Sequence, residues 1–269
     1  MCTIVVLHRV NPDYPVIIAA NRDEYYARPT ASPHLISQTP HIVAGLDGQK
    51  GGTWMGANSA GIFVGLTNQR TFKTADKALR SRGEVTREAL NHTEVGRIDE
   101  ALAALDPRQY NPFNLLYGDA ERLRVAYFHE GMTRPEIADV PQGVHVLPND
   151  RLDSERFSKV QRARDLIQPH ARAPWFELQG HLQAMLADRF LPPIQSIPPA
   201  PRGSMMPQRL IHRLEALCIK TPLYGTRSCA IAALAPGRVA RYLATEGPPD
   251  EAELKDLSAL LTPPGHEAR

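Results

Sequence analysis

The sequence lacks the features that mark several common classes of protein. Its three cysteines are few and odd in number, and no Cys-x-x-Cys pair is present, which argues against a disulfide scaffold. No stretch approaches the ~20 apolar residues that cross a bilayer, and the amino terminus lacks the charged and apolar regions of a secretory signal. We therefore expect a cytoplasmic protein with no integral membrane segment.

Charge and metal-ligand patterns are equally sparse. The 31 basic and 29 acidic residues leave a net charge of +2, so no overall field favours nucleic acid or an anionic membrane. The ten histidines show no ligand spacing, and without a His-Glu-x-x-His motif a zincin site is not expected. We expect no metal site and no nucleic-acid partner. The 269 residues, 42% of them hydrophobic, suit one large domain spanning 1–269.

The chain does contain strand patterns toward both ends and helix patterns in between. Runs rich in β-branched and aromatic residues, separated by turn formers, predict strands at 3–10, 15–20, 53–56, 61–67, 113–117, 123–128, 143–147, 229–234 and 239–245. Helical spacing of apolar residues predicts one or two helices in 81–105 and further helices at 154–167, 175–190 and 249–261. Six prolines make 192–207 a surface loop. The order of elements favours an α+β domain with sheets packed between helices.

Cys2 is the strongest chemical signal, because it directly follows the initiator Met1. Removal of Met1 would leave a thiol and a free α-amine on one residue. A thiolate is the attacking form of cysteine, and an α-amine titrates at about pH 7.7–8.0, so Cys2 would carry both a nucleophile and its base. The alternative is that Cys2 is a small apolar residue that opens a buried strand.

Six ordered motifs extend across most of the chain and resemble a known family. They are Asn21-Arg22-Asp23-Glu24, Gly51-Gly52-Thr53-Trp54, Gly65-Leu66-Thr67-Asn68, Ser81-Arg82-Gly83, Phe113-Asn114-Leu115-Leu116 and Tyr224-Gly225-Thr226-Arg227-Ser228. The chain resembles the NRDE family, which includes proteins of the Transport and Golgi organisation 2 type. That resemblance implies a four-layer αββα sandwich of the N-terminal nucleophile hydrolase type. The opening Met-Cys-Thr is also distantly similar to the choloylglycine hydrolase and penicillin V acylase group.

The resemblance implies roles for individual residues. Cys2 would be the nucleophile that attacks an amide carbonyl, and Asp23 would hold its freed α-amine. The backbone N–H of Asn68 and the side chain of Asn149 would donate to the oxyanion. These expectations imply a cysteine amidohydrolase that cleaves a small acylated substrate and needs no cofactor.

One departure from the acylase pattern concerns the cation near the thiol. The arginine that precedes the asparagine in those enzymes is replaced here by Ala20, so Arg227 becomes the candidate cation, unless it is a solvated arginine at the end of a strand. If the second strand continues to Asp23, side-chain alternation places Asn21 and Asp23 on one face and Arg22 on the other.

Asn21, Arg22 and Trp54 are expected to contact substrate. The alternatives are that Arg22 is structural and that Trp54 belongs to the core.

A second function remains open at this point. Members of the same family are proposed to handle haem or acyl lipids, so the pocket near Cys2 would then bind a ligand and release it unchanged. Without a Cys-x-x-Cys-His motif, any haem would be held non-covalently, with a thiolate or an imidazole as its ligand.

Overall fold

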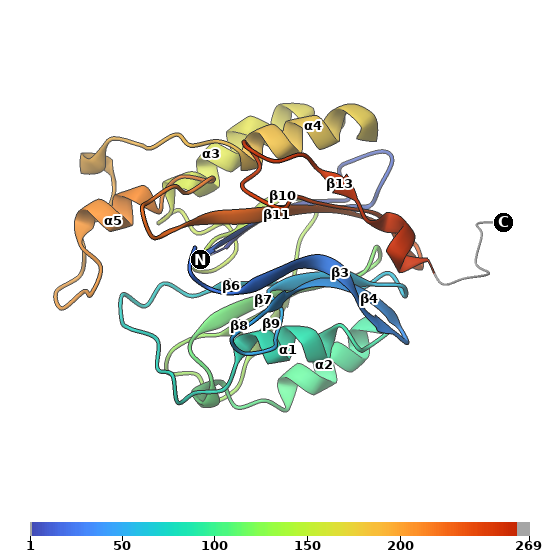
Figure 1. The fold of residues 1–269 in the computed structure, drawn as a ribbon, viewed down its shortest axis with the longest axis horizontal. Coiled ribbons are helices and arrows are strands. Elements are labelled where there is room, and N and C mark those ends of the chain that lie inside the picture. The colour runs from blue at the N-terminus through green and yellow to red at the C-terminus, as the bar shows by residue number, and fades with distance from the viewer. Residues whose placement is uncertain (1, 263–269) are drawn as a thin grey trace.

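The computed structural model describes residues 2–262. Met1 and residues 263–269 lie outside the described residues, as do the predicted removal of Met1 and both ends of the predicted 1–269 domain. Two antiparallel sheets pack face to face, and helices cover the outer face of each, which gives four layers (Figure 1). This αββα arrangement confirms the predicted fold class.

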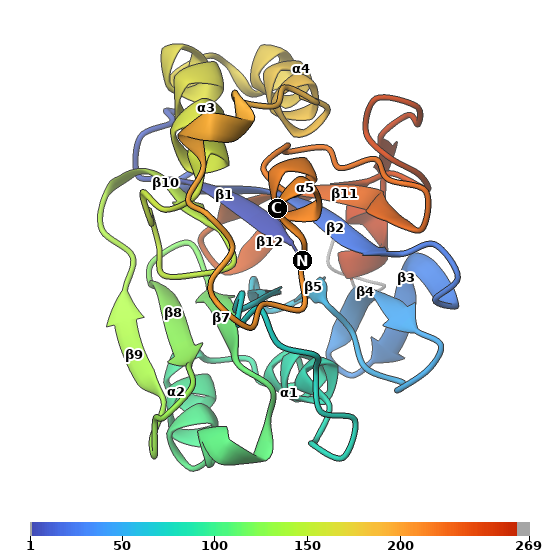
Figure 2. The same cartoon turned by 90° about the vertical axis from the view of Figure 1, so that its left-hand side faces the viewer.

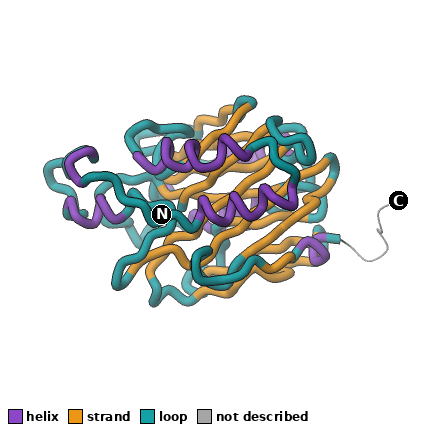
Figure 3. The backbone as a smooth tube through the Cα atoms, turned by 90° about the horizontal axis from the view of Figure 1, so that it is seen from above, coloured by secondary structure: helices purple, strands orange, loops and turns teal. Residues whose placement is uncertain are grey.

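The first sheet contains the strands from both ends of the described chain. Its order is β10 (Gly143–Leu147), β1 (Thr3–His8), β2 (Val16–Tyr25), β11 (Tyr224–Ala235), β12 (Arg238–Ala244) and β13 (Lys255–Asp256). The helices α3 (Ser158–Ile167) and α4 (Trp175–Leu186) lie on its outer face, as the view from above shows (Figure 3). β1 and β2 are almost entirely buried because one face contacts these helices and the other contacts the second sheet.

The second sheet is built from the middle of the chain. Its order is β3 (Thr30–Gln38), β4 (His41–Asp47), β5 (Met55–Asn58), β6 (Phe63–Asn68), β7 (Phe113–Gly118), β8 (Leu123–Phe128) and β9 (Glu136–Asp139). The helices α1 (Arg82–Ala89) and α2 (Val95–Ala103) cover its outer face. They correspond to the two-helix alternative for 81–105. The short helix α5 (Gln208–Arg213) follows the proline-rich segment.

Two predicted elements differ from the structure. The helix predicted at 249–261 is wrong, because this segment forms β13 and a 3₁₀ turn at Ser258–Leu261. The backbone of this segment forms hydrogen bonds with the edge of β12, whereas a short isolated helix is only marginally stable in water. The second strand continues past the predicted end at Ala20 to Tyr25. No helix in residues 2–262 combines the length and the apolar character needed to span a bilayer.

The end of the sandwich at which β1 begins is turned toward the viewer in Figure 2. At this end α5 lies near the first sheet and α1 near the second. The loop that follows β6 and the proline-rich segment are joined there by a 3.0 Å hydrogen bond from the N–H of Met205 to the carbonyl of Phe72. The predicted site residues that gather at this end include Cys2 and Asn68.

Candidate functional site

The pairing of β1 with β2 decides which side chains share a face. Thr3 is paired with Asn21, so Cys2 lies opposite Arg22 one position further on. The residues two positions away on each strand belong to the core between the sheets, so Cys2 and Arg22 point toward the second sheet. Asn21 and Asp23 occupy the opposite face, as predicted by alternation.

Cys2 is 5% exposed and lines a cavity of about 200 Å³. Burial raises the pKa of its thiol and the Asp23 carboxylate acts in the same direction, whereas a hydrogen bond from the backbone of Asp23 and the Arg22 guanidinium act to lower it. The cavity is rich in charge: its lining includes the cations Arg22, Arg28, Lys50, Lys77, Arg80 and Arg82 and the carboxylates Asp23, Glu24, Asp47 and Asp76. Basic side chains therefore outnumber acidic ones in the lining of this cavity.

Asp23 lies beside the start of β1 and is only 2% exposed. Its Oδ1 accepts a 2.6 Å hydrogen bond from Thr226 Oγ1, and its carbonyl accepts one of 2.8 Å from the Tyr224 hydroxyl. Burial raises the pKa of the Asp23 carboxyl, and Lys159 and the Thr226 hydrogen bond oppose that rise. The Thr226 hydroxyl therefore holds a buried carboxyl in place near the start of β1.

Asn149 connects the two sheets next to Cys2. Its Nδ2 donates to the carbonyl of Asn68, at the end of β6, over 2.8 Å and to the carbonyl of Cys2 over 3.4 Å. The side chain is fully buried and does not line the cavity, whereas Asn68 does. Asn149 therefore sets the spacing between the nucleophile candidate and the backbone of Asn68.

Arg22 is 3% exposed, and its guanidinium stacks on Trp54 with 3.9 Å between the guanidinium carbon and the ring centroid. In residues 2–262 the guanidinium makes no hydrogen bond or ion pair, and its Nη1 is buried without an acceptor. Both side chains line the Cys2 cavity and also a neighbouring cavity of about 450 Å³, so the stacked pair forms the wall between them.

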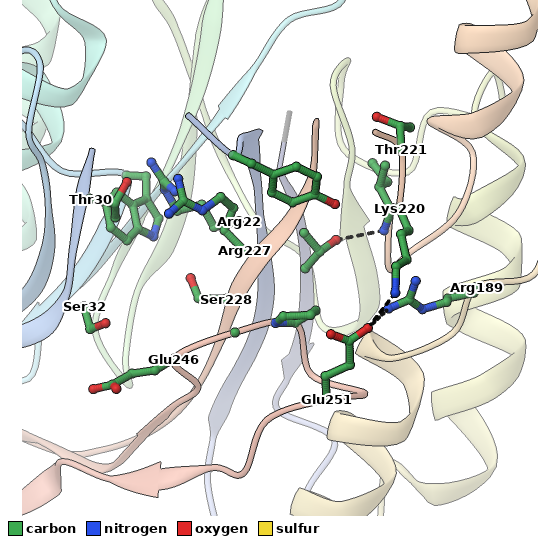
Figure 4. Close-up of a pocket in the computed structure, with 16 residues that line it drawn as sticks. Arg22, Thr30, Ser32, Arg189, Lys220, Thr221, Arg227, Ser228, Glu246 and Glu251 are labelled. Carbon is green, nitrogen blue, oxygen red and sulfur yellow. Dashed lines mark hydrogen bonds and ion pairs between the residues drawn. The ribbon is translucent and has the colours of Figure 1, made fainter. Parts of the chain in front are cut away.

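Arg227 lies in the neighbouring cavity, close to Arg22 (Figure 4). Its Nη1 donates to the carbonyls of Tyr25 and Arg28 over 3.2 and 2.6 Å. It is not among the residues that line the Cys2 cavity. The structure therefore places Arg22, and not Arg227, next to the thiol.

Asn21 is brought to neither cavity. Its Nδ2 donates to the carbonyls of Leu186 and Leu217 over 2.8 and 2.9 Å, so it anchors β2 to the end of α4. Of the predicted site residues, Cys2, Arg22, Asp23, Trp54 and Asn68 share the cavity.

Sequence reasoning missed two cations of this region. Arg82 lines the Cys2 cavity, and its guanidinium makes no hydrogen bond or ion pair within the described residues. Lys159, in the first turn of α3, is 1% exposed and interacts electrostatically with Asp23 and Cys2. The signal for Lys159 was its place on the same helical face as the apolar Ala163. For Arg82 it was the Ser81-Arg82-Gly83 motif.

The described residues 2–262 contain no candidate metal site. No group of three or more His, Cys, Asp and Glu side chains in residues 2–262 converges to hold an ion. The three cysteines are all unbonded.

Comparison with known proteins identifies both sequence and structural relatives. Residues 1–242 match the model of the Transport and Golgi organisation 2 family. The human Transport and Golgi organization protein 2 homolog is 28% identical over 234 residues, which cover 81% of each chain. The Drosophila melanogaster Transport and Golgi organization protein 2 is 28% identical over 210 residues, which cover 70% of this chain and 73% of the relative.

Solved structures share the fold at low sequence identity. The Caenorhabditis elegans ortholog of N-acylethanolamine-hydrolyzing acid amidase has a TM-score of 0.55 and 12% identity, covering 88% of this chain and 93% of its own. The C2A mutant of conjugated bile acid hydrolase from Clostridium perfringens has a TM-score of 0.54 and 11% identity, covering 97% and 94%. Penicillin V acylase from Agrobacterium tumefaciens has a TM-score of 0.51 and 13% identity, covering 91% and 83%. These neighbours have the N-terminal nucleophile hydrolase fold.

Proposed function

This chain belongs to the Transport and Golgi organisation 2 family, and from that membership, its fold and the surroundings of Cys2 we propose that it is a cysteine amidohydrolase. It cleaves the C–N bond of a small acylated substrate after Met1 has been removed. The observation that carries the proposal is the shared cavity of Cys2, Arg22, Asp23 and Asn68 at the start of β1. The three unbonded cysteines suit the reducing cytoplasm, where we place this activity.

The proposed reaction has two halves. The α-amine of Cys2 accepts the thiol proton while the sulfur bonds to the amide carbonyl carbon, and the carbonyl oxygen becomes an oxyanion. Collapse of this intermediate breaks the C–N bond, and the protonated amine returns its proton to the leaving nitrogen. Water then attacks the thioester, with the same amine as base, and releases a carboxylic acid and the free thiol.

The surrounding residues take distinct parts in this reaction. Asp23 holds the α-amine, and Arg22 takes the part of the cation that was first assigned to Arg227, since a positive charge facing the sulfur favours the thiolate. The Asn68 N–H and the Asn149 side chain donate to the oxyanion. For Asn149 this requires that its long 3.4 Å bond to the Cys2 carbonyl be exchanged for one to substrate.

Two features support an anionic group on the substrate. Arg22 and Arg82 line the cavity and neither guanidinium bonds an acceptor in residues 2–262, and Nη1 of Arg22 is buried. Burying an arginine whose donors are unsatisfied costs free energy, and a carboxylate or phosphate of the ligand would supply the missing acceptors. The cavity size of about 200 Å³ suits a small head group.

The same cations favour acyl-lipid binding without chemistry as the second candidate function. Haem is less compatible with the site. The Cys2 cavity is below the range of about 300–1,000 Å³ that encloses drug-sized ligands, and no histidine lines it. Cys2 would be the iron ligand if haem were carried there.

Intact-mass measurement of the purified chain is the first test, because retention of Met1 would remove the proposed base. The chain is then incubated with a panel of N-acyl amides that carry a carboxylate, the reaction is quenched in acid, and the intact mass of the protein is measured. We expect a mass increase equal to the acyl group on the wild type and none on C2A. C229A is the matched control, since Cys229 is a buried thiol on the opposite, helix-facing side of the first sheet. Tight binding of acyl ligands with no adduct and no hydrolysis would refute the amidohydrolase and support the carrier.

A further inference from the structure

The neighbouring cavity of about 450 Å³ is not used by the proposed reaction. Residues of β2, β3 and β11 line it, together with the segment that follows β12 (Figure 4). Its volume lies in the range of about 300–1,000 Å³ that is typical of small-molecule sites. The side chains that line it therefore indicate which ligand chemistry it would suit.

A β-bulge gathers three hydrogen-bond donors on one wall of this cavity. Ser228 is paired directly with Arg22, so these two side chains point to the same face of the first sheet. The register of β11 against β2 shifts between Thr226 and Ser228, which leaves Arg227 as the extra residue. A bulge re-aims the side chain of its extra residue, whereas successive residues of a regular strand point to opposite faces. Arg227 therefore lies close to Arg22 on the same wall (Figure 4).

All three side chains have donors to offer a ligand. Arg22 is 3% exposed, and its buried Nη1 bonds no acceptor in residues 2–262. Of the Arg227 guanidinium only Nη1 is engaged, by the carbonyls of Tyr25 and Arg28, and no carboxylate in the described part of the chain pairs with it. The half-buried Ser228 hydroxyl has no hydrogen-bond partner there either. Burying an unpaired guanidinium costs free energy, and a second one close by adds repulsion.

The carboxylates of the cavity are engaged elsewhere. Glu251 pairs with Arg189 and Lys220 over 3.1 and 2.9 Å (Figure 4). Glu246 pairs with Lys255 over 3.2 Å. None of these ion pairs includes the two arginines of the bulge wall. Their charge is therefore left for an anion from outside the chain.

We propose that the neighbouring cavity binds a small molecule through a carboxylate or phosphate group, which accepts hydrogen bonds from Arg22, Arg227 and Ser228. A guanidinium group matches the spacing of the oxygens in either anion and donates two parallel hydrogen bonds to it. The anion supplies the acceptor that Nη1 of Arg22 lacks and offsets the repulsion between the two arginines. This site is separate from the Cys2 cavity that Arg82 lines, and its occupation does not require the thiol to react.

The test titrates the full chain, labelled with ¹⁵N-arginine, with sodium phosphate and separately with sodium acetate. Sodium chloride keeps the ionic strength constant, and NMR follows the Nε–H signals of the arginines, which single substitutions assign. We expect the signals of Arg22 and Arg227 to shift together and saturably with at least one anion, which identifies the group that the site prefers. R22M and R227M should each weaken that binding at least about tenfold, because each removes a charged donor to the anion.

R82M and K220M are the matched controls. Arg82 lines the Cys2 cavity and not the neighbouring one, and Lys220 lines the neighbouring cavity but is exposed and paired with Glu251. Neither substitution should change the affinity by more than about twofold. Equal losses in K220M and R227M would indicate a diffuse positive field and overturn the proposal. A loss in R82M without one in R227M would place the anion in the Cys2 cavity and also overturn it.

The wild-type titration keeps the proposal open to refutation if R227M does not fold. Signals of Arg22 and Arg227 that do not shift saturably with either anion overturn it, and so does S228A with an unchanged affinity if R227M is also unchanged. Anion binding at this wall in a chain that hydrolyses no amide would retain this inference and reject the proposed function. Hydrolysis by a chain that binds neither anion here would do the reverse.

Discussion

Replacement of Arg22 by methionine tests which arginine governs the thiol. Directly opposed residues in an antiparallel pair have β-carbons ~4.5–5.5 Å apart, which puts the Arg22 charge roughly 8 Å from the sulfur. At that distance and an effective dielectric constant of about 20, a unit charge changes the free energy of the thiolate by about 2 kcal/mol. Because both side chains are at most 5% exposed, solvent screening is weak. R22M should therefore raise the Cys2 pKa, by at most about 1.5 pH units.

The assay follows the rate of Cys2 alkylation from pH 5 to 11 by mass spectrometry. The midpoint of the R22M profile should move upward within that limit. At a fixed pH below the midpoint the rate should fall only about 5- to 10-fold, since a thiolate of higher pKa is intrinsically more nucleophilic.

R227M is the matched control because Arg227 belongs to the neighbouring cavity and bonds the carbonyls of Tyr25 and Arg28. It should leave the alkylation midpoint nearly unchanged and lower the free energy of unfolding by about 1–3 kcal/mol, as two carbonyls lose a charged donor. A shifted midpoint in R227M with an unshifted one in R22M would refute the electrostatic assignment.

Three further substitutions have expected outcomes. N149A should lower the free energy of unfolding by about 2–4 kcal/mol in urea titrations, because the buried carbonyls of Cys2 and Asn68 lose their donor. A loss below about 0.5 kcal/mol would contradict the connection that Asn149 makes between the two sheets. W54A should lower the free energy of unfolding by about 3–5 kcal/mol in the same titration and join the two cavities. A crystal structure of W54A with two separate cavities would contradict the role of Trp54 as the wall between them. D47N should flatten the acid limb of the stability curve. Burial acts to raise the pKa of Asp47, but hydrogen bonds from Arg28 and the Gln49 N–H outweigh it, and the net pKa is lowered. Its stabilisation is therefore complete above the unfolded value of about pH 4 and lost as the pH falls through the folded value, which urea titrations between pH 2 and 6 would show.

The sequence was sufficient to predict the strands that position Cys2. The apolar runs of β1 and β2 are buried on both faces and flank a clear turn, so their signal is strong. Alternation along β2 also gave the correct faces for Arg22 and Asp23. What it did not give was the register with β1, because pairing depends on contacts between strands. Without that register, Arg22 could not be recognised as the neighbour of the thiol.

Other elements had no local signal to find. β3 is an edge strand that contains Pro33, is largely exposed and pairs with β4 through two irregularities, so it shows no regular alternation. The environment of Lys159 depends on where α3 meets the first sheet. A charged residue on an apolar helix face can be noticed in a sequence, but its burial depends on strands that lie more than a hundred residues away.

In the proposed reaction, the stacked pair of Arg22 and Trp54 would limit the length of the substrate. A compound too long for the Cys2 cavity would contact these two side chains, and not the backbone. A change of rotamer in one of them would open a passage into the larger chamber without moving a strand. Chain-length selectivity in this protein would then be controlled by torsion angles of two residues and could differ among relatives whose backbones superimpose.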